Sequence, residues 1–118
     1  MLQRDKIVNA KVYKLESAFT NSSIFITLSW VVVEDKKYPI EIFLNTKDLR
    51  FYKESIILTR LLSAIFRRNN NITFIIEELT GIHDPEGGKH KNKKYYSSIY
   101  SEIAEIIKLF FNEIGYVE

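Results

Sequence analysis

Hydrophobic and polar residues alternate along much of the first half of the chain. Residues 24–33 alternate most regularly, and successive side chains of a strand point to opposite faces, so this segment predicts a strand with one buried face. The residues expected on the buried face are Ile24, Ile26, Leu28, Trp30 and Val32. The opposite face is mixed in character, which indicates that it is partly exposed or used for binding.

Two further strands are expected beside this one. Residues 10–15 are rich in β-branched and aromatic side chains, and the turn formers Asn21, Ser22 and Ser23 separate them from the central strand. A charged turn at residues 34–37 is followed by a second alternating run at residues 40–45. Short connections of this kind predict a three-stranded antiparallel meander.

The hydrophobic period changes after Asn45. Residues 51–68 fit a helix whose apolar residues cover most of its circumference, so we expect this helix to be buried on more than one side. Three asparagines break it, and residues 72–79 predict a short second helix with Asn71 as its cap and Gly81 as its end. A third helix is expected over residues 98–114, ended by Gly115.

Residues 82–94 contain Pro85, Gly87, Gly88 and several lysines, a composition that predicts a loop. Strands followed by helices indicate an α+β fold, here a three-stranded antiparallel meander followed by three helices packed on one face. We expect one domain over residues 1–118, in which residues 1–9 form a short N-terminal extension.

The chain contains no cysteine and only two histidines, His83 and His90. This composition excludes disulfides, thiolate nucleophiles and cysteine-based zinc sites, and we expect neither a metal nor a cofactor. His83 and Asp84 are adjacent, so they rarely point at one another, and no serine nucleophile lies in a recognisable motif. The sequence therefore favours binding over catalysis, and no catalytic residue is expected.

The net charge is only +2, far from the strongly basic balance of proteins that bind duplex DNA. No segment approaches the length and hydrophobicity of a membrane span, and residues 1–9 hold no apolar run of signal-peptide length. We expect a cytoplasmic protein that binds neither DNA nor a membrane.

Two segments could recognise an anion. Gly87 and Gly88 would let backbone N–H groups approach a ligand closely beside lysines that attract phosphate, although lysine-rich loops are commonly just solvated. Arg60, Ser63 and Arg67 recur on one stripe of the first helix, where the arginines could face one partner. Alternatively, they could cover the core edge and pair with Glu77 and Glu78.

Aromatic rings follow the glycine-rich loop at Tyr95, Tyr96 and Tyr100. Each could stack on a nucleotide base, which contributes roughly 1–3 kcal/mol per base. Tyrosines at such positions are more often packing residues with hydrated hydroxyls. The sequence leaves both readings open.

Four segments together resemble the TSCPD-type domain over about residues 10–115: PIEIFLN (39–45), LTRLLSAIFRR (58–68), FIIEEL (74–79) and DPEGG (84–88). The resemblance implies the small C-terminal segment or accessory chain of adenosylcobalamin-dependent ribonucleotide reductases. The cysteine of the domain's name is absent, since His83, Asp84 and Pro85 occupy its place, and three asparagines replace a glycine-containing turn. Reductase chemistry needs cysteines, so this chain could only assist a separate catalytic subunit.

As a stand-alone chain, the sequence is similar to the first Thoeris anti-defence family of phages in length, element order and the loop after the second helix. The resemblance implies a sponge that binds glycocyclic ADP-ribose without degrading it, in the host bacterial cytoplasm, and some members also bind cyclic oligonucleotides. A sponge is our first hypothesis, and a reductase accessory chain is the alternative. A nucleic-acid-binding module ranks last, because its lysines lie in one loop.

The same resemblance suggests roles for individual residues. Arg60 and Arg67 would contact phosphate, and Tyr96 would stack on the base. The residues expected around the base and ribose are His83, Asp84, Gly88 and Asn92. Because the first helix is more apolar than one short sheet can cover, we also expect a homodimer or higher homo-oligomer with pockets at the subunit boundary.

Overall fold

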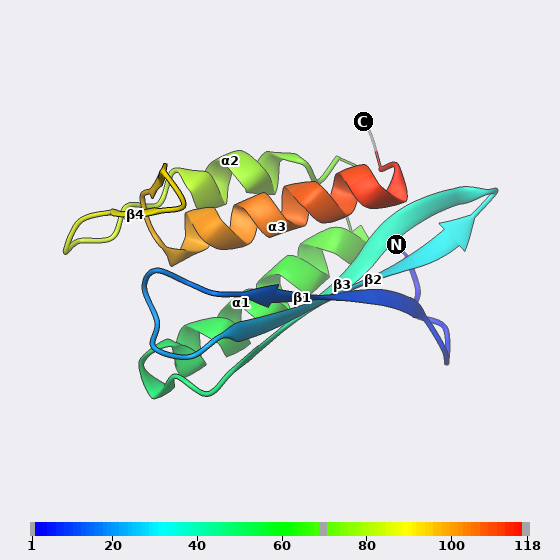
Figure 1. The fold of residues 1–118 in the computed structure, drawn as a ribbon. Helices are drawn as coiled ribbons and strands as arrows, with labels where there is room; N and C mark the ends of the chain where they lie inside the picture. Colours follow the sequence, from blue (N-terminus) through cyan, green and yellow to red (C-terminus); the bar gives the residue numbers. More distant parts are fainter. Residues whose placement is uncertain (1, 69–70, 117–118) are drawn as a thin grey trace.

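The computed structural model describes residues 2–68 and 71–116. Its main sheet is antiparallel, with the strands in chain order (Figure 1): β1 (Asn9–Leu15), β2 (Ile24–Val33) and β3 (Lys36–Thr46). The helices follow, with a short hairpin between the second and third: α1 (Leu49–Arg68), α2 (Phe74–Thr80), β4 (Lys89–Lys91), β5 (Lys94–Tyr96) and α3 (Ile99–Ile114). The predicted α+β meander followed by three helices is confirmed.

A β-bulge interrupts the pairing of β2 and β3. Ser29 lies opposite Glu41 whereas Trp30 lies opposite Pro39, so Ile40 is the extra residue of β3. A bulge bends the strands and increases their twist, and the regular alternation of burial in β2 ends there. Val31 is buried and Val32 is exposed, so the prediction that Val32 lies on the buried face was wrong.

The β2–β3 and β4–β5 hairpins use two-residue turns in the left-handed region. Glu34 and Asp35 join β2 to β3, and Asn92 and Lys93 join β4 to β5, all with φ between 52° and 67°. Such turns match the twist of the flanking strands. The prediction that residues 82–94 form only a loop was wrong, because strands made of lysine, histidine and tyrosine carry no hydrophobic alternation.

Helix α1 lies along the edge of β3 that no strand pairs. The Ser63 hydroxyl donates to the carbonyl of Ile42 at 3.0 Å and accepts from its N–H at 3.1 Å. The Thr59 hydroxyl accepts from the N–H of Leu44 at 3.2 Å. These hydroxyls satisfy backbone groups that would otherwise lie open at a sheet edge.

Only one side of α1 is buried in the chain. Phe51, Leu62 and Phe66 enter the core, whereas Ile57 and Leu61 are exposed. The prediction of a helix buried on more than one side was therefore wrong for the single chain, since only β3 and the core beneath it cover α1. The helix also begins earlier than predicted, because the Asp48 carboxylate accepts from the N–H of Arg50 at 2.9 Å.

The other two helices differ in how well local signals define them. Thr73, not Asn71, precedes α2, and no side chain caps it, so the predicted Asn71 cap was wrong. Ser98 caps α3 in a capping box with Ser101, and Gly115 ends it in the left-handed conformation, as predicted. α2 and α3 lie together on one side of the sheet (Figure 1).

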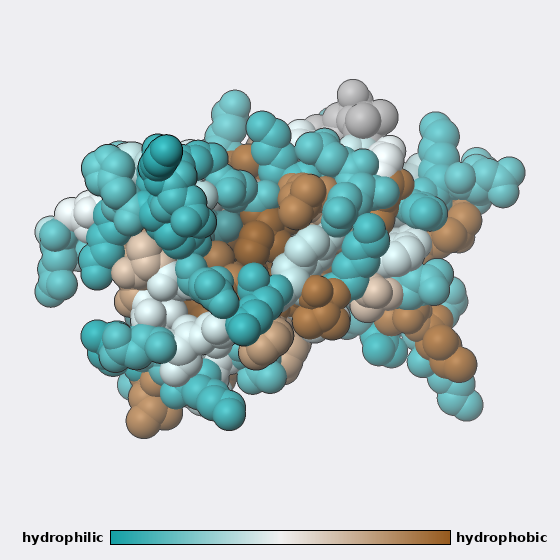
Figure 2. All heavy atoms as spheres, in the orientation of Figure 1, coloured by the Kyte–Doolittle hydropathy of each residue, from teal (hydrophilic) through white to brown (hydrophobic). Residues whose placement is uncertain are grey.

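The core fills the space between the sheet and the helices. Ile26 and Leu28 of β2 and Ile42 of β3 belong to the same buried cluster as Ile103 and Phe110 of α3. Figure 2 shows hydrophilic atoms over the helical layer and hydrophobic atoms in the band between this layer and the sheet. Within the described residues, no helix is both long and apolar enough to cross a bilayer.

Candidate binding groove

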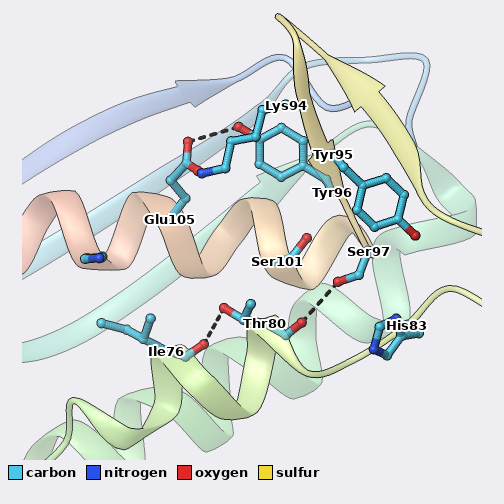
Figure 3. Close-up of a pocket in the computed structure, with 10 residues that line it drawn as sticks. Ile76, Thr80, His83, Lys94, Tyr95, Tyr96, Ser97, Ser101 and Glu105 are labelled. Atoms are coloured by element: carbon cyan, nitrogen blue, oxygen red, sulfur yellow. Dashed lines mark hydrogen bonds and ion pairs between the residues drawn. The ribbon is translucent and has the colours of Figure 1, made fainter.

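A groove of about 570 Å³ lies between α2, α3 and the β4–β5 hairpin (Figure 3). Volumes of this size are typical of small-molecule sites. The residues that line it are Ile76, Thr80, His83, Lys94, Tyr95, Tyr96, Ser97, Ser101, Glu105 and Lys108. We call this cavity the hairpin groove.

Glu105 joins the hairpin to α3 at one wall of the groove. Its carboxylate pairs with the Lys94 ammonium and accepts from the Tyr96 hydroxyl at 3.0 Å (Figure 3). The Lys94 pairing lowers the pKa of Glu105, and the same contact raises the pKa of Lys94. Burial, reinforced by the Glu105 hydrogen bond, raises the pKa of Tyr96. These contacts hold the wall in one arrangement.

The two neighbouring tyrosines play different parts. Tyr96 is only 8% exposed, and the ammonium groups of Lys91 and Lys94 lie 5.1 and 5.4 Å from its ring centroid. Tyr95 is 52% exposed and lines the same groove. The ring that is open for stacking therefore belongs to Tyr95, whereas Tyr96 was the residue predicted from sequence.

The opposite wall is built from hydroxyls that bond to backbone carbonyls. Ser97 donates to the carbonyls of Thr80 at 3.0 Å and Ile82 at 3.1 Å, and the Thr80 hydroxyl donates to Ile76 at 2.6 Å. The two Ser97 bonds connect the end of α2 to the residues just before α3, whereas the Thr80 bond lies within α2. The Ser97 bonds fix the width of the groove at the point where the loop leaves α2.

A buried carboxylate anchors the hairpin to the rest of the fold. The side chain of Glu102 is 0% exposed and accepts from the Ser17 hydroxyl at 2.5 Å, the Ala18 N–H at 2.9 Å and the Lys91 ammonium at 2.9 Å. Lys91 also donates to the carbonyl of Glu16 at 2.9 Å. α3, the hairpin and the β1–β2 loop therefore meet at one ion pair.

A family model for the TSCPD domain matches residues 4–111, nearly the whole chain. The chain belongs to the TSCPD domain family. This agrees with the resemblance carried by its sequence motifs. No curated protein and no solved structure matches this TSCPD domain.

Most of the predicted lysine cluster of this TSCPD domain is already engaged. Lys91 and Lys94 pair with Glu102 and Glu105, and the Lys89 ammonium lies 5.4 Å from the centroid of the Phe19 ring. Lys93 occupies the hairpin turn. The loop thus offers an anion fewer free charges than its composition indicates.

The two predicted arginines lie outside the hairpin groove. Arg60 lines a separate groove of about 340 Å³ between β3 and α1, and Arg67 pairs with Glu41 at 3.8 Å. Glu41 belongs to β3, whereas the sequence suggested partners on the second helix. In a single copy of the TSCPD domain, the arginines and the predicted loop residues do not line one cavity.

The predicted loop residues mainly shape the groove. The Asp84 carboxylate accepts from the N–H of Glu86 at 2.8 Å, and Asn92 lies at the hairpin tip with φ 53°. A Cβ on Gly88 would lie 2.2 Å from the Tyr95 hydroxyl, so this position needs glycine for the ring to approach. Of the seven predicted site residues, only His83 and Tyr96 line the hairpin groove.

Sequence reasoning missed Lys108 and Thr80. Lys108 lines the groove and forms no ion pair within the part of the chain that the structure describes. Its position on α3, three residues after Glu105, is the signal that could have placed it there. Within residues 2–68 and 71–116, no three histidine or carboxylate side chains gather closely enough to hold a metal ion.

Proposed function

We propose that this TSCPD domain binds a small nucleotide in the hairpin groove and releases it chemically unchanged. The observation that carries the proposal is that the exposed Tyr95 ring and the Lys108 ammonium group, which forms no ion pair within the described residues, line one cavity of about 570 Å³. A base stacked on an aromatic ring gains roughly 1–3 kcal/mol, and ammonium groups form charge-assisted hydrogen bonds with phosphate. The groove offers both kinds of contact.

The contacts around the groove support binding without turnover. The hydroxyls of Thr80 and Ser97 donate to backbone carbonyls, and Glu105 is held by Lys94 and Tyr96. Among the described residues, His83 has no hydrogen-bonded carboxylate that would orient it as a base. An activated nucleophile needs such a base within hydrogen-bond reach.

The specific function that we propose is that of a sponge. The bound nucleotide would be an immune signal such as glycocyclic ADP-ribose, and its sequestration in the bacterial cytoplasm would block Thoeris anti-phage defence. The resemblance to the first Thoeris anti-defence family supports this proposal. A sponge must hold scarce signal, which requires nanomolar affinity, about −12 kcal/mol.

Calorimetric titration with glycocyclic ADP-ribose isomers tests the proposal, with cyclic oligonucleotides as a second ligand class. The bound ligand is then released by denaturing the protein and checked by chromatography. We expect nanomolar binding and intact release, with a loss of about 5- to 150-fold in affinity in Tyr95→Ala. Lys108→Glu should also weaken binding, and Lys53→Glu, an exposed change on α1, should not. Cleaved ligand, or no binding, contradicts the proposal.

A second candidate function follows from family membership over residues 4–111. As an accessory chain, the domain would bind the cysteine-bearing large subunit of an adenosylcobalamin-dependent ribonucleotide reductase. Mixing the two purified proteins and measuring their sedimentation tests this candidate. A stable complex, together with no nucleotide binding by the free domain, would favour the accessory chain over the sponge.

A further inference from the structure

The face of the sheet that points away from α3 carries an unusual number of exposed hydrophobic side chains. Val12, Thr27 and Phe43 lie side by side across the three strands, and Phe25 occupies the next row of β2. Val12 is 63% exposed, Phe25 43% and Phe43 56%. In the chain alone, these side chains face water.

The exposed face continues onto α1 across the edge of β3. Tyr52 is 51% exposed and Ile56 is 44% exposed, and both line the groove of about 340 Å³ that also contacts Phe43. We define the outer apolar patch by Val12, Phe25, Phe43, Tyr52 and Ile56. It lies on different elements from the hairpin groove, which is built from α2, α3, β4 and β5.

The size of the outer apolar patch matches one side of a stable protein interface. Side chains of these sizes expose roughly 150–220 Å² each when fully open. The exposed fractions of the five patch residues therefore add up to a solvent-accessible area of roughly 450–500 Å². A standard interface buries about 800 Å² per partner, of which roughly 57–65% is apolar. The patch therefore supplies about the apolar area that one partner contributes.

We infer that a second copy of this chain covers the outer apolar patch, with the two sheets packed face to face about a two-fold axis parallel to β2. This axis places β1 of one copy over β3 of the other. Val12 of each copy then contacts the larger Phe43 of the other copy. The two Phe25 side chains contact each other at the axis. The surface is thus complementary to itself, as a two-fold interface requires.

The charges around the patch suit a neutral partner such as a second copy. The cross-strand row that contains Phe25 ends in Lys14 and Asn45, which would face one another across the axis. Glu41 is already paired with Arg4 and Arg67. Lys14 also pairs with Glu16. Arg60 borders the groove beside Tyr52 and Ile56, so the described charges around the patch are scattered rather than a run of one sign.

This inference goes beyond the proposed function and does not depend on it. Because the interface lies on the outer face of the sheet, each copy keeps its own hairpin groove. The sequence led us to expect pockets at the subunit boundary, and this dimer would instead carry two separate ones. Ligand stoichiometry should then be one per chain.

Sedimentation velocity of the purified full chain provides the first test. We expect a dimer at micromolar concentration for the wild type, and a monomer for Phe43→Glu. Leu109→Glu is the matched control, because Leu109 is similarly exposed but lies on α3. Circular dichroism checks that each variant is folded. A monomeric wild type, or dissociation by Leu109→Glu but not by Phe43→Glu, overturns the inference.

The absence of cysteine makes a direct cross-linking test possible. Phe25→Cys introduces a single thiol near the proposed axis, where sheets packed face to face lie about 10 Å apart, too far for a direct disulfide. A short bismaleimide that spans about this distance should convert most of this variant to a covalent dimer. Leu109→Cys should remain largely monomeric on a denaturing gel. Equal cross-linking of the two variants would indicate random collision and would overturn the proposed geometry, even if the wild type were dimeric.

Discussion

Glu102 and Glu105 lie one turn apart on α3, and each binds a lysine of the hairpin. They differ in burial, since the Glu102 side chain is 0% exposed and that of Glu105 is 46% exposed. We predict that Glu102→Ala strongly destabilises the fold, whereas Glu105→Ala has little effect. The comparison contrasts a buried ion pair, whose carboxylate also accepts from Ser17 and Ala18, with an exposed one, whose carboxylate also accepts from Tyr96.

The magnitude follows from the groups that lose their partner. Glu102→Ala leaves the Lys91 ammonium, the Ala18 N–H and the Ser17 hydroxyl without their acceptor. Breaking a buried ion pair by removing one partner costs about 3–5 kcal/mol. Lys91 is 24% exposed and can turn toward water, so we expect about 3 kcal/mol. Solvent screening limits the Lys94–Glu105 pair to at most about 1 kcal/mol.

Urea unfolding followed by circular dichroism measures both changes. With a slope of about 2 kcal/mol per molar urea, Glu102→Ala should lower the midpoint by about 1.5 M, and Glu105→Ala by less than about 0.5 M. Glu102→Gln keeps a hydrogen-bond acceptor but not the charge, so its urea midpoint should lie between those of the two alanine variants. If Glu102→Ala costs no more than Glu105→Ala, burial does not strengthen this pair and the reasoning is refuted.

Three further predictions concern the sheet edge, the hairpin and pH. Ser63→Ala removes both hydrogen bonds to Ile42 and should cost about 1–2 kcal/mol in urea unfolding, whereas no loss would mean that water replaces the hydroxyl. Gly88→Ala should leave stability within about 1 kcal/mol, because the exposed Tyr95 ring can swing away, yet should weaken nucleotide binding in calorimetry. The lowered pKa of Glu105 means that its contribution is present above the unfolded carboxyl pKa of about 4.3 and is lost as pH falls through the folded pKa. Glu105→Gln should therefore lose stability less steeply than wild type below about pH 4.3, and parallel acid profiles would contradict this.

The elements that the sequence predicted best are those with several local signals that agree. β2 has the predicted bounds, because a segment that alternates up to the bulge and is rich in β-branched residues is flanked by turn formers on both sides. α3 spans Ile99–Ile114, close to the expected residues 98–114, because its apolar stripe and Gly115 both marked it; the Ser98 cap was not predicted. Agreement between propensity, pattern and termini makes such segments predictable.

The parts that escaped prediction depend on contacts between distant residues. The hairpin is held by Glu102 and Glu105, which follow it in sequence, and no local pattern reveals these pairs. Arg67 pairs with Glu41 of β3, 26 residues earlier in the sequence, because α1 runs back along the edge of β3. The choice of Tyr95 over Tyr96 as the open ring depends on which side of β5 faces α3. Strand alternation shows that the two differ, but only the fold decides which is buried.

The hydroxyls that occupy the edge of β3 also limit how these sheets could join one another. A subunit with two unpaired sheet edges can add further subunits without limit, as a bifunctional monomer forms a polymer. A subunit with one unpaired edge can form only a dimer. Ser63 and Thr59 block the β3 edge of the main sheet at Ile42 and Leu44, and within the described residues the β1 edge carries no such cover. Pairing through strand edges would therefore stop once two β1 edges had joined. By covering the β3 edge, α1 protects the fold against fibre formation.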